Sequence, residues 1–550
     1  MVQKSKFLVV LLVAIFSTVS ASASAAVWQW SVPVESVTST ETHGHPRAYL
    51  WIPETCRQVR GVVIGQHNML EEGVLEHPVF RKALGEAGFA TVWVTPALDP
   101  VFRFDQGVGE HVERMMTALA KESGYSEIEF APVIPLGHSA MASFPYHFAA
   151  WKPERTLAAI SLKGRWPDFR DQNSPPWKDA DLKDVPLLFV SGEYEWADEC
   201  AGKALDFRRG TPGSPLTMLA DAGGGHFDIH DELIAYLGLY VKKVAEHRLP
   251  GGTPADGEVK LKPVNPERDG WLVDRWRQNA GPLAEPDSVK DYKGEKDQAF
   301  WCFDKEHALA TAEFGKAQHL KKPQLAGYRQ GGLIVSQDKE THQQVTLPFK
   351  PMGDGLTFKL EGTFLDAVPD GRPVCWTGLP AGSPVDHASG KVTISRICGP
   401  VEKLADDTFA LRFDRLGFDN SKRSNEIWLM AVHPGDGEYK RCVQQAVLRF
   451  PLRNTAGEDQ QIRFPEVKDQ RAGAEPIKLH ALSSAKDAEV RYYIREGPAE
   501  IDGDTLKLTA IPPRAKYPVK ITVVAWQWGR SIEPKLKSAE PVTQSFSIMK

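Results

Sequence analysis

The fold is decided by a short segment that reads VIPLGHSAM over residues 133–141. Its first four residues are apolar and include two β-branched ones, which predicts a strand, and a helix-compatible stretch with several small residues follows. A serine between such a strand and helix lies on a sharp turn, so the residues around it must be small. Gly137 meets this need before Ser139, whereas Met141 takes the place where a second glycine is common. The segment therefore predicts a strand–turn–helix unit with an exposed serine at its turn.

The sequence around this unit, from residue 27 to 249, alternates short β-branched runs with helical stretches, which predicts an α/β domain with a mostly parallel sheet. The predicted strands are Arg47–Ile52, Gly61–Gln66, Ala90–Thr95, Val133–Leu136, Thr156–Leu162, Pro186–Val190 and Pro215–Leu219. The predicted helices are Pro78–Ala87, Val108–Lys121, Met141–Ala150, Ala197–Arg208 and Asp228–Glu246.

Two further polar loops follow predicted strands of the same domain. The segment SGEYEWAD at 191–198 is rich in carboxylates, and AGGGHF at 222–227 is a glycine loop that ends in His226. The carboxyl ends of parallel strands meet at one edge of a sheet, so the serine, an acid and the histidine are expected there together. This chain order, serine, acid, histidine, is the order of the α/β-hydrolase triad.

Residues 27–249 thus resemble secreted α/β-hydrolases of the esterase type. The resemblance implies that Ser139 is the nucleophile and His226 the general base that later returns the proton to the leaving group. The predicted signal peptide and the additional β-rich modules, both described below, add an analogy to carbohydrate esterases.

The acid is chosen among three neighbouring carboxylates. Glu195 lies three residues after Gly192, where the family usually has its aspartate, and Asp198 and Glu193 are near enough to compete. A glutamate can orient imidazole as well as an aspartate. We therefore expect Glu195, with Asp198 in reserve.

Acyl transfer also needs two N–H donors aimed at the developing oxyanion. One is expected to be the amide of Ala140, directly after the serine. The other should come from the turn QHNML at 66–70, where the amide of Asn68 or Met69 is the candidate.

The substrate is expected to be an ester of a polysaccharide. Only about 60 residues separate Ser139 from the acid, which leaves little chain for a large lid and favours an open cleft. Arg165 and Trp166 follow a strand at the same sheet edge, and Trp196 lies beside the acid, so these three are candidate substrate contacts, although a solvated loop with packed tryptophans fits equally. The sequence predicts an acetyl, methyl or aromatic acyl esterase. A peptidase or amidase on the same residues, and an inactive carbohydrate-binding protein, remain alternatives.

Composition and the N-terminal segment bound the setting. The chain has 550 residues with a net charge of -5, which does not favour nucleic acid as a partner. An apolar run, Phe7–Phe16, follows Lys4 and Lys6 and precedes small residues up to Ala26, which predicts a signal peptide over 1–26 rather than a transmembrane segment. We therefore expect a secreted or periplasmic protein. The sequence does not predict its oligomeric state.

The second half of the chain is predicted to be β-rich. Residues 250–316 are expected to be a linker and a segment of unassigned fold, because 250–257 is rich in proline and glycine. Short alternating runs predict a β-sandwich over 317–459. Residues 460–550 resemble bacterial immunoglobulin-like modules, as indicated by the runs QIRFP at 461–465, VRYYI at 490–494 and PVTQSF at 541–546. We expect a spacer or docking role for this module.

Six cysteines in an exported protein tend to pair. Cys375 with Cys398, and Cys302 with Cys442, are plausible pairs, although the connectivity is open. None has the close spacing of a zinc or redox site, so we expect no metal and no cofactor.

Overall fold

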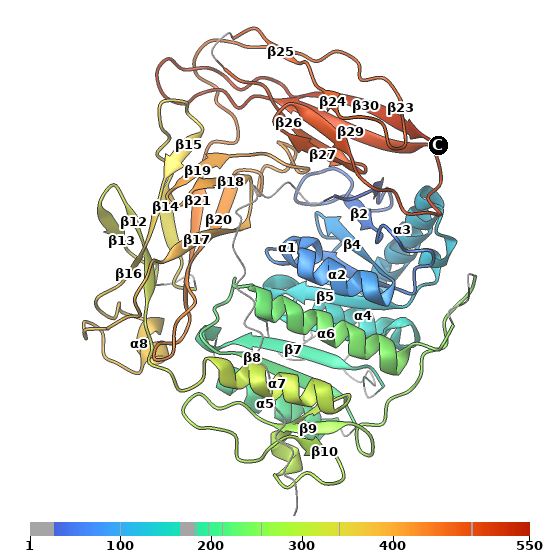
Figure 1. Cartoon of the computed structure of the whole chain (residues 1–550), viewed down its shortest axis with the longest axis vertical. Helices are drawn as coiled ribbons and strands as arrows, with labels where there is room; N and C mark the ends of the chain where they lie inside the picture. Colours follow the sequence, from blue (N-terminus) through green and yellow to red (C-terminus); the bar gives the residue numbers. More distant parts are fainter. Residues whose placement is uncertain are drawn as a thin grey trace, which may run out of the picture.

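The computed structural model describes residues 27–99, 101–164, 182, 184–195, 197–211, 213–252, 254, 256–339, 342–485 and 488–550. Its first half is an α/β body around an eight-stranded sheet of order β1-β2-β4-β3-β5-β6-β7-β8 (Figure 1). The strands are β1 (Trp30–Pro33), β2 (Arg47–Trp51), β3 (Gly61–Gln66), β4 (Phe89–Thr95), β5 (Val133–His138), β6 (Ala159–Leu162), β7 (Leu187–Gly192) and β8 (Leu216–Asp221).

Strand β2 runs antiparallel to both its neighbours, β1 and β4, and the remaining pairs of the sheet are parallel. Every residue of β3, β5, β6, β7 and β8 is buried, as expected for central strands covered on both faces. This strand order and the serine turn after β5 are those of an α/β-hydrolase, which confirms the predicted fold class.

Helices cover both faces of the sheet. They are α1 (Glu71–Glu76), α2 (Pro78–Ala87), α3 (Val108–Ser123), α4 (Phe144–Trp151), α5 (Ala197–Gly210) and α6 (Asp231–Arg248). Alternation along β3 divides the core, since Val62 and Ile64 pack in the cluster that includes α3 and α4, whereas Val63 packs in the cluster that includes α2 and α6. Strand β1 and helix α1 are additions to the predicted elements, and the helix predicted from Met141 begins at Phe144.

The segment 250–316 extends the α/β body. It contains β9 (Trp271–Asp274), β10 (Asp287–Ser288), β11 (Ala299–Cys302) and α7 (Lys305–Ala317), with the strands in the order β10-β9-β11. The Thr217 hydroxyl of β8 donates to the carbonyl of Trp301 at 2.6 Å, and Trp301 is buried in the same cluster as α6. The segment for which no fold was predicted is thus packed against the β8 edge of the eight-stranded sheet.

The next region, up to residue 459, is built of three small sheets. Its elements are β12 (Ala326–Gln330), β13 (Leu333–Val335), β14 (Val345–Pro348), β15 (Thr357–Lys359), β16 (Glu361–Phe364), α8 (Arg372–Thr377), β17 (Thr393–Cys398), β18 (Val401–Ala405), β19 (Thr408–Leu411), β20 (Glu426–His433) and β21 (Cys442–Arg449). The sheet orders are β13-β12-β16, β14-β21-β20-β17 and β15-β19-β18. Side chains from all three sheets share one core.

The last region forms further small sheets. Its strands are β22 (Ile462–Arg463), β23 (Gln470–Arg471), β24 (Ile477–Lys478), β25 (Leu482–Ser483), β26 (Arg491–Glu496), β27 (Ala499–Asp502), β28 (Thr505–Leu508), β29 (Val519–Trp526) and β30 (Val542–Met549). The sheet orders are β22-β25, β23-β30-β29-β26 and β24-β28-β27. The immunoglobulin-like identity of this region, like the domain boundaries, stays a prediction.

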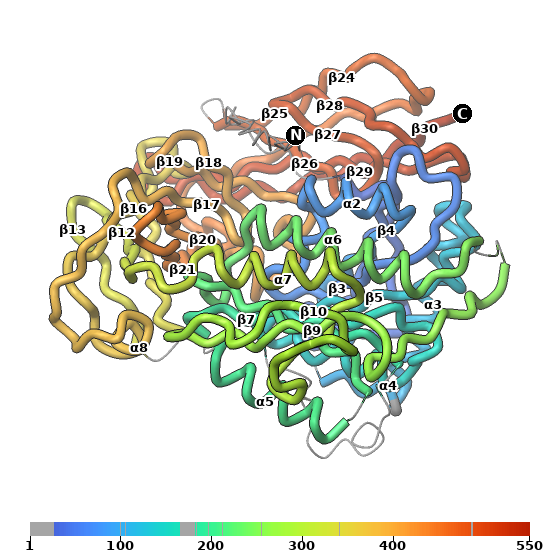
Figure 2. The backbone as a smooth tube through the Cα atoms, turned by 60° about the horizontal axis from the view of Figure 1, so that its bottom comes forward, coloured from blue at the N-terminus to red at the C-terminus, as the bar shows by residue number. Residues whose placement is uncertain are grey.

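This C-terminal region is packed onto the start of the described chain. Trp28 forms an antiparallel bridge with Gly497, and Arg47 contacts the Glu496 carboxylate at 2.8 Å. Figure 2 shows the orange and red C-terminal strands beside the blue N-terminal part. Core side chains of the two regions belong to one apolar cluster. The regions are therefore joined by a continuous core.

The six cysteines are free thiols, so neither predicted pair is formed. Cys302 is buried in β11 beside Thr311, whereas Cys442 begins β21 in a different core cluster. Cys375 is exposed on α8, and Cys398 ends β17.

No helix within the described ranges combines the length and apolar character needed to cross a membrane. The predicted signal peptide lies outside the described residues.

Candidate active site

Ser139 lies on the turn that joins β5 to α4. It has φ of +52°, in the left-handed region, and starts a short 3₁₀ turn over Ser139–Met141. A Cβ on Gly137 would lie 1.9 Å from the carbonyl oxygen of Met141, so only glycine fits at that position. Met141 itself is buried in the core. The turn thus accepts methionine where a second glycine is common.

His226 reaches the serine from the glycine loop after β8. Its Nε2 lies 2.7 Å from Ser139 Oγ, within hydrogen-bond distance. Gly223 has φ of +72°, and a Cβ on Gly224 would clash with the Asp221 carboxylate at 2.1 Å. The glycines therefore allow the sharp loop that brings the imidazole to the end of β5.

Glu195 ends a 3₁₀ turn, Glu193–Glu195, after β7. Its Oε2 lies 3.2 Å from Nδ1 of His226, and the two side chains are only 12% and 6% exposed. The structure therefore brings Ser139, His226 and Glu195 together in one line of contacts.

The two competing carboxylates face other partners. Asp198, held in reserve from the sequence, pairs with Arg275 at 2.5 Å. Glu193 pairs with Lys440 at 2.8 Å and accepts the amide of Gly223 at 2.8 Å. Among these three acids only Glu195 contacts the imidazole.

The environment sets suitable charges on the acid and the base. Burial alone would raise the pKa of Glu195, but the imidazoles of His226 and His342, whose Nδ1 atoms lie 3.2 Å and 3.7 Å from its two oxygens, lower it to about 2. Burial lowers the pKa of His226 below its usual value of 6.5, and the Glu195 carboxylate partly offsets this. A neutral imidazole beside an ionised carboxylate is the state that a general base needs.

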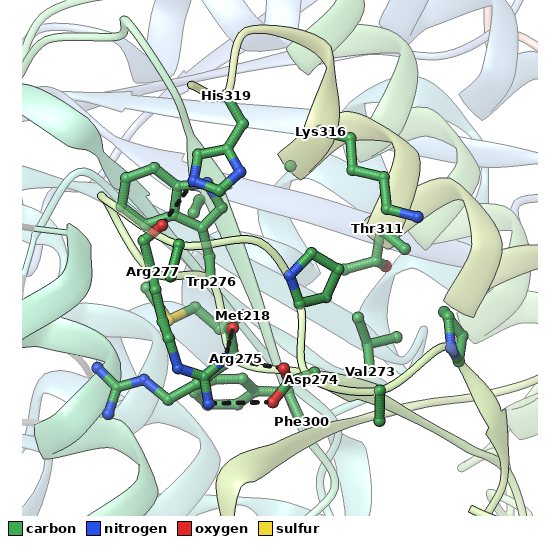
Figure 3. Close-up of a pocket in the computed structure, with 17 residues that line it drawn as sticks. Met218, Val273, Asp274, Arg275, Trp276, Arg277, Phe300, Thr311, Lys316 and His319 are labelled. Atoms are coloured by element: carbon green, nitrogen blue, oxygen red, sulfur yellow. Dashed lines mark hydrogen bonds and ion pairs between the residues drawn. The ribbon is translucent and has the colours of Figure 1, made fainter. Parts of the chain in front are cut away.

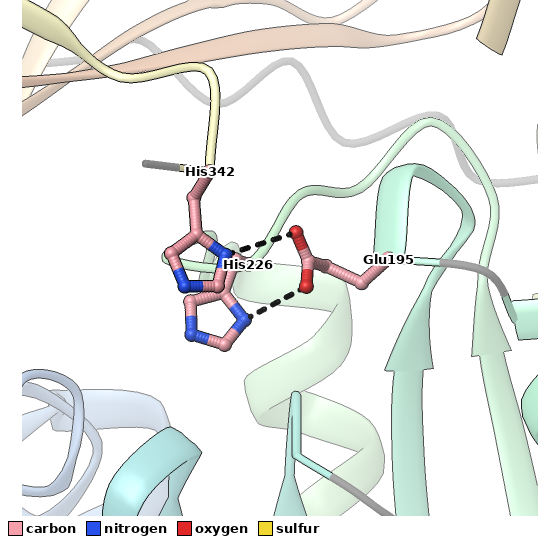
Figure 4. Close-up of side chains that lie close together, drawn as sticks. All are labelled: Glu195, His226 and His342. Atoms are coloured by element: carbon pink, nitrogen blue, oxygen red, sulfur yellow. Dashed lines mark ion pairs between the residues drawn. The ribbon is translucent and has the colours of Figure 1, made fainter. Parts of the chain in front are cut away.

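The β-rich region also reaches Glu195. His342 stacks on His226 with ring centroids 4.4 Å apart and planes 11° apart, and its Nδ1 lies 3.7 Å from Glu195 Oε1 (Figure 4). Arg372 of α8 lies 3.3 Å from the same oxygen. The Trp376 indole donates to the carbonyl of Tyr194 at 2.9 Å. Sequence reasoning missed these residues, because no local motif marks them and only the long-range fold brings them here.

The expected oxyanion donors stay candidates. Ala140 is exposed directly after the serine. The Met69 amide donates to Glu71 Oε2 at 3.1 Å, which makes Met69 the weaker of the two candidates in this loop. The Asn68 side chain donates to the carbonyl of His138 at 2.8 Å, which fixes the loop beside the serine turn and leaves the Asn68 amide as the second candidate.

Glu71 is a second residue that the sequence did not reveal. Its buried carboxylate accepts the amide of His138 at 2.7 Å as well as that of Met69, so it connects the loop after β3 to the serine turn. Burial raises its pKa to about 7, although the hydrogen bonds oppose the rise. Its position just after an apolar strand was the available signal.

The three predicted substrate contacts, Arg165, Trp166 and Trp196, lie outside the described residues. Lys163, two residues before Arg165, is buried and paired with Asp221, which in turn contacts His230 at 3.1 Å. The described start of this loop is thus a buried ion pair.

Histidine and carboxylate side chains gather at three places in the described chain, around Glu195, Asp221 and Asp304. At each place a basic side chain already contacts the carboxylate, namely Arg372, Lys163 and Lys243 respectively. These cations supply the positive charge that a metal ion would bring, so we assign none of the clusters to a metal or cofactor.

The described residues line two cavities, one beside the loop of Asn68 and Met69 and one among β8, β9 and α7. One is lined by Asn68 and Met69 on one side and by Arg396, Arg423 and Trp428 on the other. It therefore lies between the expected oxyanion loop and the β-rich region.

The other cavity lies among β8, β9 and α7 and is shown in Figure 3. Trp276 and Phe300 line it, and Arg277 at its edge pairs with Asp274 at 2.8 Å. Neither the serine nor its two partners line this cavity.

Comparisons with known proteins give only distant likenesses. No family model matches the chain, and no curated protein matches it by sequence. Among solved structures, the fluorophosphonate-binding serine hydrolase FphF of Staphylococcus aureus is 14% identical, covering 40% of this chain and 96% of that one, with a TM-score of 0.27.

An S-formylglutathione hydrolase from Agrobacterium tumefaciens is 14% identical over 42% of this chain and 98% of that one, with a TM-score of 0.29. A dienelactone hydrolase from Anabaena variabilis is 18% identical over 40% and 97%, with a TM-score of 0.28. Because all these scores are low, we base the fold on the strand order and the site on its own geometry.

Proposed function

We propose that this chain is a serine hydrolase that cleaves carboxylic esters through an acyl-enzyme. The proposal is carried by one observation, the contact series from Ser139 Oγ to His226 Nε2 at 2.7 Å and from His226 Nδ1 to Glu195 Oε2 at 3.2 Å. The left-handed serine turn supports it, because such a turn holds the hydroxyl out from the backbone.

In this mechanism His226 Nε2 accepts the Ser139 hydroxyl proton while Oγ bonds to the ester carbonyl carbon. The carbonyl electron pair moves to the oxygen, and we assign its stabilisation to the amides of Ala140 and Asn68. The tetrahedral intermediate then expels the alcohol, which takes the proton from the imidazolium. A water molecule repeats the sequence on the acyl-enzyme and releases the acid. Glu195 stabilises the imidazolium throughout.

We further propose that the ester belongs to a polysaccharide that carries acetyl, methyl or aromatic acyl groups, and that the protein works in the periplasm or outside the cell. The apolar segment 7–16 followed by small residues supports export. The cavity beside Asn68 is lined by the Trp428 ring and by Arg396 and Arg423, whose guanidinium groups also pair with Asp414 and Glu41. An aromatic face and guanidinium donors suit a sugar ring and its hydroxyl groups.

Labelling by a fluorophosphonate probe tests the nucleophile without the natural substrate. We expect mass spectrometry to find the adduct on Ser139 alone, and Ser139→Ala to lose both labelling and hydrolysis of short-chain aryl esters. Loss of the nucleophile of a catalytic triad lowers kcat by roughly 10⁴-fold or more. Ser143→Ala is the matched control, because Ser143 lies in the same turn, before α4.

Equal ester turnover by wild type and Ser139→Ala would refute the proposed triad. Cleavage of aryl amides as fast as aryl esters would instead favour the amidase reading. Acetate release from an acetylated polysaccharide tests the substrate class. Turnover confined to small aryl esters would refute the proposal that the substrate is a polysaccharide ester.

A further inference from the structure

The loop that carries His342 is held in an unfavourable backbone conformation. His342 and Gln343 have φ of +48° and +53°, and neither is glycine. The backbone of a non-glycine residue keeps a left-handed conformation only where the surrounding structure imposes it. Such positions gather at functional sites.

The surroundings here are two glutamines of β21. Gln444 Nε2 donates to the carbonyl of Gln343 at 2.6 Å, and Gln445 Nε2 donates to the carbonyl of His342. Both glutamines are buried. A Cβ on Gly371 would lie 2.8 Å from the Gln343 side chain, so the loop is also packed against the start of α8, which carries Arg372. The β-rich region thus fixes His342 and Arg372 together.

The ring that this loop presents is directed at the proposed acid and base. It lies nearly parallel to the His226 ring at 4.4 Å, and its Nδ1 is 3.7 Å from Glu195 Oε1 (Figure 4). The other carboxylate oxygen, Oε2, faces His226. The two oxygens of Glu195 are therefore divided between the base and the β-rich region.

This division restricts how Glu195 can move. A carboxylate held at one oxygen only can rotate about its side chain, whereas contacts at both oxygens fix its plane relative to the imidazole. The stacked ring also covers one face of His226 and keeps water away from the contact between Nδ1 and Oε2. Partners in this position act on the orientation of the reacting group without touching the substrate.

We propose that His342 is a positioning residue of the hydrolase site, so that the site is composite and the β-rich region is required for full catalysis. This inference rests on the proposed ester hydrolase function. It assigns to this region a role in the reaction itself, beyond the spacer or docking role expected from the sequence.

Removal of His342 has a directional consequence for the pH dependence. The charged and titratable groups around His226 are Glu195, His342, Lys163 and His138, with Arg372 beyond Glu195. Burial and the charges of His342 and Lys163 lower the pKa of His226, and Glu195 raises it. Loss of the His342 ring removes one lowering charge and part of the burial, so the pKa of His226 should rise.

The test uses the full chain with His342→Ala, His342→Phe and the control His387→Ala. The control histidine lies in the same region and also stacks on an aromatic ring, Phe364, at 4.0 Å. We expect His342→Ala to slow fluorophosphonate labelling of Ser139 and ester kcat/KM by roughly ten- to a hundredfold. The acid limb of the kcat/KM profile should move to higher pH, and His387→Ala should change neither quantity.

His342→Phe keeps the stacked ring without the Nδ1 contact, so it separates shielding of His226 from the share of the hold on Oε1 that His342 adds to that of Arg372, and it guards against a folding defect. We expect intermediate rates. In a double-mutant cycle, His342→Ala should have little further effect once Glu195→Gln is present, because both act through one contact.

Labelling rates and acid limbs equal to wild type in both His342 variants, or fully additive effects with Glu195→Gln, would overturn the positioning role. A wild-type protein that is not labelled at Ser139 would refute the proposed function instead. The two failures are therefore distinguishable.

Discussion

The α/β body and the β-rich region reach the same point of the molecule by different means. In the α/β body, Ser139, His226 and Glu195 follow three parallel strands, so sheet geometry alone brings them to one edge. The β-rich region reaches that edge with a strained loop and one short helix, anchored by buried side chains far away in the sequence. The proposed catalytic residues thus come from one sheet, whereas the residues that contact Glu195 from outside come from a distant part of the chain.

The largest effect should come from a change in the α/β body. We expect Glu195→Gln to lower kcat/KM by about 10³- to 10⁴-fold, because a neutral amide neither stabilises the imidazolium nor fixes its tautomer. Asp198→Asn, three residues along, should have little effect, since Asp198 faces Arg275. Steady-state kinetics on an aryl ester measure both. A larger loss in Asp198→Asn would transfer the acid's role to that residue.

The contact between the two regions should give the next effect. Lys440 of the β-rich region and Glu193 of the α/β body form a pair whose side chains are 8% and 1% exposed. We expect Lys440→Met to destabilise the protein by about 3–5 kcal/mol, because it leaves a buried carboxylate without its cation. A fall in Tm by calorimetry would show this.

A matched control for that change is Lys322→Met, because Lys322 pairs with Glu438 in the same region but both are largely exposed. Exposed pairs contribute at most about 1 kcal/mol. Equal Tm shifts in the two variants would mean that the buried pair does not hold the regions together.

The smallest effect concerns the pH dependence of stability within the α/β body. Burial raises the pKa of Glu71 to about 7, above its usual value of 4.5, so the folded state binds a proton that the unfolded state has lost between these values. Stability should therefore fall as pH rises from about 4.5 to 7, by up to about 3 kcal/mol.

Glu71→Gln should remove this dependence, and Tm values of both proteins at pH 5 and pH 8 measure it. The control is Glu110→Gln, at an exposed position on α3. A pH dependence that survives in Glu71→Gln would show that other groups cause it.

Much of the α/β body could be predicted because its signals are local. The buried β-branched runs predicted the central strands within a few residues, and Ser139, Glu195 and His226 could be selected because each follows such a strand. Strand β1 and helix α1 could not be predicted from the sequence, since β1 is a short edge strand and α1 has only six residues. Met141 seemed to weaken the serine turn, but the core accepts its side chain.

The rest depends on contacts between residues far apart in the sequence. His342 lies in a loop and Arg372 begins the short helix α8, and neither sequence shows a catalytic motif. The glutamines of β21 anchor the His342 loop, and Gly371 packs against Gln343 of that loop. Met69 is the weaker oxyanion candidate because the Glu71 carboxylate, whose direction no pattern reveals, accepts its amide. The pair of Cys302 and Cys442 failed for this reason, because only the fold assigns these buried thiols to different cores.

The bridge between Trp28 and Gly497 also constrains the order in which the chain can assemble. Trp28 finds this partner only after the chain up to Gly497 has been made, so the start of the described chain stays without it until then. Native contacts over such a sequence distance slow folding, because a very long loop must close first. A protein built this way should complete its fold late, and should benefit from a chaperone that shields its N-terminal strands until then.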